Sequence, residues 1–338
     1  MREDVTDLTP ETVRALLYQA WGLVPDRLDV MSGEIATVCR VRVGGELLAV
    51  KSLPGTPDDG ALVNWQTEAV AALAAAGLPV PGVLPTVDGA LVHESVESGR
   101  QVFTTVSAWL PDPPLATVDV DQDLLRAVGV MTGRVSATLA TFPAPPVPAQ
   151  HEWELLRTAD TIRAVLDRVV DPHVASLASL VAARHDTIVR SALGELPHSV
   201  VHHDLHDDNL LVGRTPTGGR GITGILDFGD MVVGPRIAEY VVAAAYVSRH
   251  TADPVSSILE VARGWHGEQP LSAAERRVLL TGVQSRLALN AAVWSARSAG
   301  PRGSYASSRS AGTVEALERL LAVDPASFES RLRSICPE

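Results

Sequence analysis

The sequence predicts an α+β protein with two lobes, a small strand-rich N-terminal lobe over residues 1–108 and a larger helical lobe over residues 109–338. Three observations support this prediction. A chain of 338 residues is long enough for roughly two domains. Short segments with the periodicity of strands gather in the first part of the chain. The proline-rich segment LPDPPL at 110–115 ends this pattern, and most of the remainder has helical periodicity.

The N-terminal lobe is expected to begin with a capped helix and to continue as an antiparallel sheet with a second helix. Residues 36–52 predict two strands joined by a Gly-Gly turn, so that Lys51 lies at the end of a strand. Residues 61–76 predict a helix, because apolar residues recur there at helical spacing and a glycine and two prolines follow. Further short strands are expected near 83–93 and 101–108.

The C-terminal lobe is expected to be helical apart from three β-prone segments at 199–202, 209–213 and 222–227. The last two are separated by GRTPTGGRG, which has the composition of a turn. Helical patterns resume with RIAEYVVAAAYVSR and continue through SAAERRVLLTGVQSRLALNAAVWSARS.

Composition excludes several classes of protein. The net charge of -12 argues against a nucleic-acid surface and favours cationic partners. No apolar run approaches the roughly 20 residues that a membrane span needs, and the acidic start does not resemble a signal peptide. We therefore expect a cytoplasmic protein without membrane contact. The two cysteines, Cys39 and Cys336, are too few for a disulfide framework or a cysteine zinc site. The sequence leaves open whether the protein is a monomer or a homodimer.

One basic residue is distinctive. Of the 28 basic residues, Lys51 is the single lysine and all others are arginine. A GC-rich genome explains the general preference for arginine. A lysine that persists against this preference indicates a role for a compact charge on a flexible stem, which the planar guanidinium of arginine cannot fill.

Polar residues crowd the stretch VHHDLHDDNLLV at 201–212, in which Asp204 and Asn209 are five residues apart. Downstream, ILDFGD places Asp227 at the end of another β-prone segment. Carboxylate and amide oxygens of this kind suit Mg²⁺, which takes its other ligands from phosphates and water. A strand lysine, a D-x-x-x-x-N loop and an Asp-Phe-Gly motif in this order are the parts of a kinase phosphoryl-transfer site.

With these motifs the chain resembles the aminoglycoside phosphotransferase and choline kinase superfamily, most closely its hydroxylysine-kinase-like branch. The resemblance extends from the strands near residue 36 to the helix that carries Arg286 and Asn290. It implies a protein-kinase-like fold with a β-rich N-lobe, a helical C-lobe and a nucleotide, ATP or GTP, in the cleft between them. The acceptor would be a small molecule with a hydroxyl group.

The resemblance also implies roles for individual residues. Asp204 would be the base that orients and deprotonates the acceptor hydroxyl, Asn209 and Asp227 would bind Mg²⁺, and Lys51 would bind the nucleotide phosphates. The remaining positions are His202 as a brace of the loop, the backbone of Ser107, Ala108 and Trp109 at the nucleotide base, and Ser32 and Gly33 in the phosphate-covering turn.

Two positions depart from the family pattern. His203 stands where the family usually has glycine, and this extra imidazole either reaches the substrate or fills space. The usual partner of the strand lysine is a helix glutamate, for which Glu68 is the obvious candidate. The helical periodicity instead places Gln66 on the inward face, together with Val63. We therefore predict Gln66 as the partner of Lys51, with Glu68 as the alternative.

Other classes of function were weighed against a small-molecule kinase. The histidines of HHDLH suggest a metal-binding tract, but the segment is not expected to be a helix that would support ligands at i, i+4, and it lacks a second shell. A nucleotide-binding pseudokinase without turnover would not need Asp204, Asn209 and Asp227 together. A protein kinase is disfavoured because only 12 residues separate Asp227 from Glu239, too few for a peptide-docking activation segment.

The acceptor is expected to be cationic, because six acids stand against three arginines between residues 204 and 239. Asp208 or Glu239 is the predicted contact for a substrate amine. An antibiotic, either an aminoglycoside or a basic cyclic peptide such as capreomycin or viomycin, is preferred as the acceptor, and the kinase would then confer resistance. The alternative is a metabolic kinase of a hydroxylated amino acid or amino alcohol such as hydroxylysine, homoserine or choline. In that case Arg286 is the expected partner of an α-carboxylate.

Overall fold

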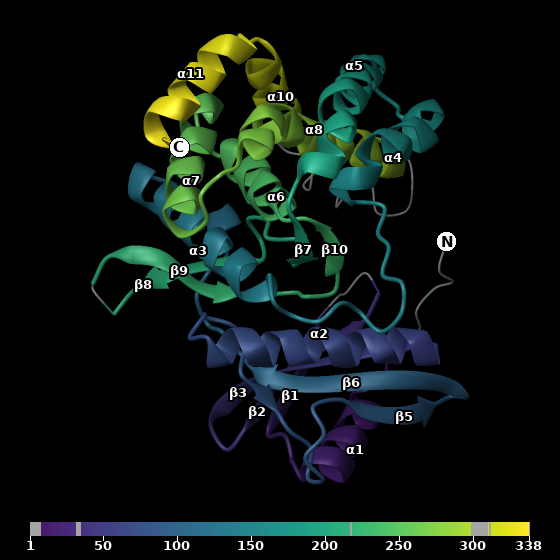
Figure 1. Ribbon diagram of the computed structural model, residues 1–338. Coiled ribbons are helices and arrows are strands. Elements are labelled where there is room, and N and C mark those ends of the chain that lie inside the picture. The colour runs from purple at the N-terminus through teal and green to yellow at the C-terminus, as the bar shows by residue number, and fades with distance from the viewer. Residues whose placement is uncertain (1–7, 32–34, 217, 299–309, 311, 338) are drawn as a thin grey trace. The chain divides into compact units, whose positions relative to one another are not determined.

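A computed structural model describes residues 8–31, 35–216, 218–298, 310 and 312–337 (Figure 1). Two predicted phosphate-turn residues, Ser32 and Gly33, lie outside these ranges. The chain divides into two compact units. The first comprises Met1–Pro111 and Pro145–Ala149, and the second comprises Asp112–Ala144 and Gln150–Glu338. The predicted lobe boundary was placed after residue 108.

The first unit is built on an antiparallel sheet in the strand order β1-β2-β3-β6-β4, with β5 also paired to β6. Strand β3 is therefore central. The strands and the two helices of this unit have the following bounds: α1 Pro10–Trp21, β1 Arg27–Met31, β2 Thr37–Val43, β3 Glu46–Gly55, α2 Pro57–Ala75, β4 Val83–Leu84, β5 His93–Glu97 and β6 Arg100–Ala108.

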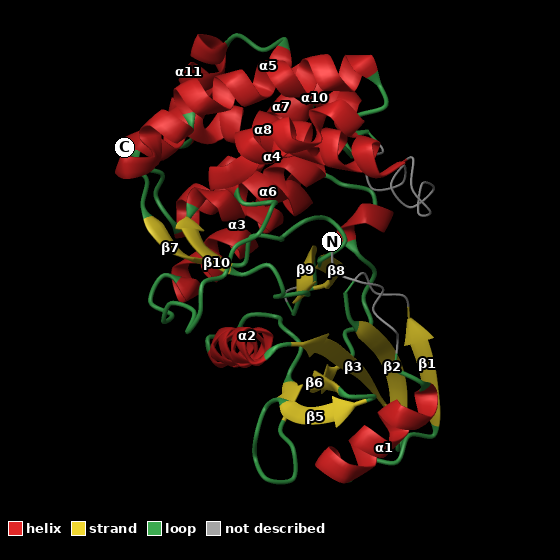
Figure 2. Ribbon diagram, turned by 90° about the vertical axis from the view of Figure 1, so that its right-hand side faces the viewer, coloured by secondary structure: helices red, strands yellow, loops and turns green. Residues whose placement is uncertain are grey.

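Helices α1 and α2 cover opposite faces of this sheet (Figures 1 and 2). The apolar side of α1 packs on Val50 of β3 and Val106 of β6. On the other face, the ring of Phe103 approaches Gly60 of α2 so closely that a Cβ atom there would lie 2.2 Å from it. In the β3–β6 register Lys51 is paired with Thr105, which lies two residues from Phe103 and so on the same face of the sheet. The Lys51 side chain therefore points to the α2 face.

Helix α2 begins earlier than the sequence pattern predicted. Thr56 caps it, and a reciprocal capping box joins the Thr56 side chain to the Asp59 backbone and the Asp59 side chain to the Thr56 backbone. Pro57 occupies the first turn, where its missing N–H costs nothing. The periodic apolar residues used for the prediction start one turn later, which explains the difference.

The second unit is helical apart from two short antiparallel strand pairs, β7 with β10 and β8 with β9. None of its described helices, nor any described helix of the first unit, is long and apolar enough to cross a membrane. The longer elements have the following bounds: α3 Gln122–Leu139, α4 Thr158–Val165, α5 Pro172–Ile188, β7 His198–Val201, β8 Leu210–Arg214, β9 Arg220–Ile225, β10 Val232–Pro235, α6 Ile237–Ser248, α7 Pro254–Glu268, α8 Ala273–Ser298, α10 Thr313–Leu321 and α11 Pro325–Ile335.

Helix α6 is the centre of this unit. All of its residues are buried, and it packs against α3, α7 and α8. A helix that is apolar on every side can only be stable inside a core. The first turn of α6 follows β10, which pairs with β7, so the core helix and the loop after β7 are held together. The expected mixed fold, with a small antiparallel sheet and a larger helical part, is confirmed.

Candidate active site

The polar stretch that the sequence singled out forms the loop between β7 and β8 in the second unit. Strand β7 is fixed by β10 at one end of the loop, and β8 is fixed by β9 at the other. Asp227 follows the end of β9. The two segments carrying Asp204 and Asp227 are thus attached to one small framework of paired strands.

The imidazole of His202 ties the two segments together. It is fully buried, its Nε2–H donates to the Leu226 carbonyl over 3.1 Å, and its Nδ1 accepts the backbone N–H of Asp204 over 3.2 Å. These two partners require a neutral ring with its proton on Nε2. Burial lowers the pKa of His202, which also favours the neutral ring. Its ring also contacts Phe228, with centroids 4.4 Å apart. This is the bracing position that the sequence predicted.

Glu239 is a second brace of the loop and does not occupy the predicted substrate-facing position. Its side chain is completely buried in the first turn of α6. One carboxylate oxygen accepts the backbone N–H of His202, and the other accepts that of His203 over 3.1 Å. Burial raises the pKa of Glu239 to about 8, although the two N–H donors act to lower it. Such a buried carboxylate, already bonded to backbone, does not fit the expected contact with a substrate amine.

Three side chains converge on the carboxylate of Asp204. The Asn209 amide donates to Oδ2 over 2.9 Å, His206 Nε2 lies 3.4 Å from the same oxygen, and a nitrogen of Arg286 lies 3.4 Å from Oδ1. Burial acts to raise the pKa of Asp204, but His206, Arg286 and His202 outweigh it and hold the pKa well below its ordinary value. Asp204 is therefore an oriented, ionised carboxylate.

His206 lies between two acids. Its Nε2 faces Asp204, and its Nδ1 lies 3.6 Å from a carboxylate oxygen of Asp207. Burial lowers the pKa of His206, but the two carboxylates raise it to about 10. The backbone N–H of Asp208 donates to Nδ1 over 3.0 Å and favours the neutral ring. The carboxylates of Asp204 and Asp207 thus favour the protonated ring of His206, whereas the N–H of Asp208 favours the neutral ring.

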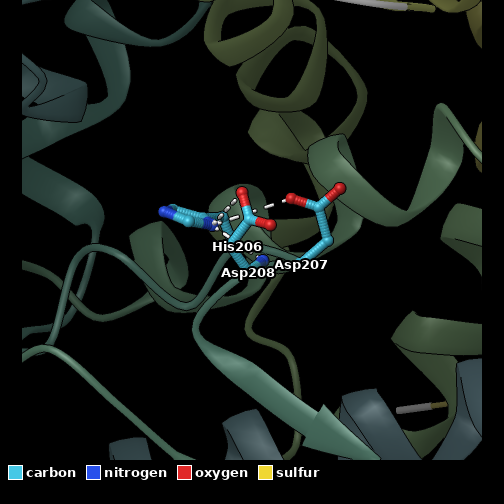
Figure 3. Close-up of side chains that lie close together, drawn as sticks. All are labelled: His206, Asp207 and Asp208. Carbon is cyan, nitrogen blue, oxygen red and sulfur yellow. Dashed lines mark hydrogen bonds and ion pairs between the residues drawn. The ribbon is translucent and has the colours of Figure 1, made fainter. Parts of the chain in front are cut away.

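His206, Asp207 and Asp208 lie close enough together to suggest a metal site, since one ligand atom of each falls within 4.8 Å of the others (Figure 3). The partners of Asp207 argue against this. Its buried carboxylate accepts from Arg249 over 2.7 Å and pairs with His250. Burial acts to raise the pKa of Asp207, but hydrogen bonds from His206 and His250 and the charge of Arg249 keep it far below its ordinary value. The charge a metal ion would neutralise is already neutralised by the protein.

Asn209 and Asp227 remain suited to Mg²⁺. Because the Asn209 amide nitrogen donates to both the backbone carbonyl and the carboxylate of Asp204, its Oδ1 points to the other side as an oxygen ligand. Asp227 is exposed, and one of its carboxylate oxygens accepts the N–H of Gly229 over 3.3 Å. Its φ of 55° lies in the left-handed region. An amide oxygen and an exposed carboxylate are the donor types that Mg²⁺ prefers.

Asp208 has the exposure expected of a substrate contact, since 42% of its side chain is accessible. The wider negative field predicted from the sequence is largely offset. Asp207 is paired with Arg249, and Asp204 is paired with Arg286. The count of acids along the chain overestimates the negative charge available to an acceptor.

Arg286, on α8, adjoins Asp204 and an aromatic side chain. One of its nitrogens donates to the Trp153 carbonyl over 3.0 Å, and its guanidinium lies 5.1 Å from the centroid of the Trp153 ring and 5.5 Å from that of Tyr246. Only 4% of its side chain is accessible. The Tyr246 hydroxyl in turn accepts from Asn290 over 3.0 Å. Arg286 is thus a fixed cation beside the candidate base.

His203 has an unusual backbone conformation, with a φ of 68°. Glycine adopts this left-handed conformation without strain, whereas histidine does not. The His203 Nε2 accepts the backbone N–H of Leu155 over 3.2 Å. Burial and the nearby Arg286 lower the pKa of His203 to about 3, so the ring is neutral.

In the first unit, the predicted nucleotide-binding residues are placed on the central strands and on α2. Lys51 and Gln66 are half-buried, whereas Glu68 is exposed. The N–H of Ala108 donates to the Gly82 carbonyl over 2.8 Å, and that of Trp109 donates to the Leu47 carbonyl over 3.0 Å. These two amides are used within the sheet. Any contact of the Ser107–Trp109 segment with a nucleotide base must therefore use its other backbone groups.

Several site residues were not predicted from the sequence. His206 and Asp207 lay in the quoted stretch but had no visible partners, because Arg249 and His250 come from the end of α6. Trp153 was an isolated aromatic residue in a polar segment. The one feature of the sequence that could have indicated its role is that a large aromatic side chain in a polar segment needs a surface to pack on.

The fold and the site together define a class. A small antiparallel sheet with a lysine on its central strand, and a helical part whose loop presents an Asp and Asn pair followed by a further Asp, form a protein-kinase-like phosphotransferase fold. The chain belongs to the phosphotransferase enzyme family, whose model matches residues 32–275.

Known proteins similar to the chain include the hydroxylysine kinase of Mus musculus, which is 26% identical over 67% of this chain and 63% of the relative. The match thus spans less than two thirds of the relative's length. Among solved structures, an amicoumacin kinase in complex with AMP-PNP and Ca²⁺ has a TM-score of 0.70 at 16% identity, over 95% of this chain and 97% of its own. A microcompartment-associated aminopropanol kinase has a TM-score of 0.69 at 18% identity, over 96% of this chain and 100% of its own. These likenesses show the fold.

Proposed function

We propose that the protein transfers the γ-phosphate of ATP or GTP to a hydroxyl of a small, amine-bearing acceptor, and that this acceptor is a hydroxylated amino acid of the hydroxylysine type. The observation that carries the proposal is the carboxylate of Asp204, held between Asn209, His206 and Arg286. An ionised carboxylate that is oriented by three side chains fits a hydroxyl-positioning group.

The low pKa of Asp204 defines its part in the reaction. A strongly acidic carboxylate is a weak base, so it takes a full proton only when the hydroxyl has become acidic by bonding to phosphorus. Phosphoryl transfer passes through a loose transition state in which little proton transfer is needed early. The main contribution of Asp204 is then to accept a hydrogen bond from the hydroxyl and aim its oxygen.

Other residues would bind the nucleotide. The Oδ1 of Asn209 and the carboxylate of Asp227 would hold Mg²⁺, which neutralises phosphate charge when bound. Lys51 would bind the phosphates, with Gln66 as its partner. The exposed position of Glu68 favours Gln66 over Glu68 in this role.

The surroundings of Asp204 support an acceptor that carries a carboxylate. Arg286 lies beside the candidate base. A second arginine, Arg297, lies with its guanidinium 5.0 Å from the ring centroid of Trp294, but it is partly exposed and ion-paired with Glu152. The buried cation of Arg286 beside the candidate base disfavours a polycation and favours an amino acid, whose amine Asp208 would bind. The hydroxylysine kinases among the relatives agree with this choice.

An antibiotic acceptor is the second candidate function. It is supported by the exposed carboxylate of Asp208 and by the net charge of -12, both of which attract cations. Aminoglycosides and basic cyclic peptides carry several amines, which would need more acidic contacts than Asp208 alone offers. A non-catalytic nucleotide-binding role is the remaining alternative.

A coupled nucleotide-turnover screen tests the proposal. ATP and GTP, each with Mg²⁺, are combined with hydroxylysine, homoserine, an aminopropanol, choline, an aminoglycoside and capreomycin, and products are identified by mass spectrometry. We expect a phosphorylated amino acid as the main product. Phosphorylation of the antibiotics alone would favour the second candidate, and nucleotide binding without any product would support the non-catalytic role.

A further inference from the structure

His203 carries a hydrogen-bond donor for which the described residues offer no acceptor. Its Nε2 accepts the Leu155 N–H over 3.2 Å, so in the neutral ring the proton must be on Nδ1. This Nδ1 is buried, and among the described residues it has no partner. Only 2% of the residue is accessible. A buried N–H without an acceptor is costly and calls for an oxygen at that position.

Arg286 carries a second donor of the same kind. Two of its nitrogens have partners, the Trp153 carbonyl and Asp204, whereas its Nε is buried with no acceptor in the part of the chain that the structure describes. His203 and Arg286 line one small cavity, whose other walls are Trp153, Leu155, Thr158 and apolar residues of α6. The two residues that carry the unpartnered donors therefore border the same space.

The backbone of His203 adds an independent observation. The described chain contains three non-glycine residues with positive φ, namely Ser98, His203 and Asp227. A non-glycine side chain kept in such a conformation is strained, and such strain is often found at functional positions. Glycine would remove the strain of His203, but it would also remove the donor.

We propose that His203 Nδ1–H and Arg286 Nε–H together bind one carboxylate oxygen of the acceptor substrate, which makes His203 a specificity-determining residue for amino acids. The inference rests on the proposed function, since it concerns the acceptor of that reaction. Arg286 contacts Asp204 with a different nitrogen, so the same guanidinium separates the substrate carboxylate from the catalytic one. A water molecule offers the same oxygen chemistry, and the experiment must distinguish the two sources.

The test compares two acceptors that differ only by the carboxylate, hydroxylysine and its decarboxylated diamine. His203→Gly removes the donor and tolerates the left-handed backbone. We expect the ratio of kcat/KM for hydroxylysine to that for the diamine to fall roughly tenfold, through KM, because a hydrogen bond to a charged group is lost. Ser98→Gly in the turn between β5 and β6 is the matched control, since it relieves the same kind of strain away from these residues and should leave the ratio unchanged.

Three outcomes would overturn the inference. Equal increases of KM for both acceptors would assign the cavity to water. No change of KM for either acceptor would mean that His203 makes no contact with the acceptor. A wild-type enzyme that phosphorylates other hydroxyl compounds but not hydroxylysine or homoserine would contradict the inference while leaving the kinase activity intact.

Calorimetry separates the inference from the proposed function. Lysine and cadaverine lack the hydroxyl and cannot react, so their binding is measurable without turnover. We expect wild-type protein to bind lysine more tightly than cadaverine, and His203→Gly to reduce this preference roughly tenfold. A preference that is absent from the wild type, or unchanged in the variant, would count against the carboxylate contact whether or not any acceptor is phosphorylated.

Discussion

Replacing Asp204 by asparagine should reduce both activity and stability, because every neighbouring group around its carboxylate is a donor. The Asn209 amide lies 2.9 Å from one oxygen, and His206 and Arg286 lie 3.4 Å from the two oxygens. In either orientation, the new amide group turns its own donor toward one of these donors. Removing the charge also leaves Arg286 buried with a weaker partner.

The magnitudes follow from this geometry. Loss of a hydroxyl-positioning base typically costs ~10²–10⁴ in rate, equivalent to ~3–5 kcal/mol in the activation barrier. A hydrogen bond to a charged group contributes ~1.5–3 kcal/mol. Since only the Asn209 bond has normal length, we expect the free energy of unfolding of Asp204→Asn to fall by ~2–4 kcal/mol.

The assay measures kcat at saturating acceptor, nucleotide affinity by calorimetry, and unfolding by urea followed by circular dichroism. Asp119→Asn is the matched control, because it makes the same chemical change at an exposed position of the same unit. Nucleotide should still bind to Asp204→Asn. A kcat within tenfold of wild type, or a loss explained entirely by weaker nucleotide binding, would refute the catalytic assignment.

A double-mutant cycle with Arg286→Met sharpens the stability argument. Each single variant leaves one member of a buried ion pair without its partner, whereas the double variant removes both charges. We expect the combined loss of stability to be smaller than the sum of the single losses by ~1–3 kcal/mol. Strict additivity would show that Arg286 and Asp204 do not interact.

Further predictions concern other groups. Burial lowers the pKa of His185 to about 4, so the stability that its neutral form provides is present above the ordinary pKa and is lost as the pH falls toward 4. His185→Asn, which retains a polar atom near Ser285, should remove up to ~3 kcal/mol of this acid dependence in unfolding measured from pH 7 to 4. Above pH 8, where Glu239 is ionised and both of its oxygens accept, Glu239→Gln should lower stability by ~2 kcal/mol and also lower kcat, because one backbone N–H of the loop then faces a donor; unchanged urea unfolding at that pH would contradict the bracing role. Asp227→Asn should raise the Mg²⁺ concentration for half-maximal turnover at least tenfold, and an unchanged Mg²⁺ titration would exclude it as a ligand.

The contact between Asp204 and Asn209 is accessible to prediction because the two residues are close in the sequence. Asp204 and Asn209 lie in one loop, and the spacing in the sequence is enough to place the amide nitrogen against the carboxylate. Lys51 could be placed on a strand from alternation alone, and the β3–β6 register then decides which face it occupies. Short-range order and periodicity carry this information directly.

The role of Glu239 could not be predicted in the same way. An acid near the motif in the sequence suits a substrate contact as well as a structural brace, and the choice depends on which backbone N–H groups face it in three dimensions. Those N–H groups belong to His202 and His203, far earlier in the chain. The pairing of β7 with β10 brings these N–H groups to the first turn of α6. Strand β10 has only four residues, too few to be predicted from the sequence pattern.

The polar groups around the loop between β7 and β8 form a continuous series, and this order has consequences for the proposed mechanism. Arg249 pairs with Asp207, Asp207 lies near His206, His206 lies near Asp204, and Asp204 pairs with Arg286. Asp204 and Asp207 each lie between an arginine and His206, so both carboxylates are oriented by the protein itself. A carboxylate oriented before the acceptor arrives has no reorganisation cost during the reaction. The same series explains why changes at Asp207 or Arg249, which are remote from the acceptor hydroxyl, should act on kcat through the orientation of Asp204 rather than on the affinity for nucleotide.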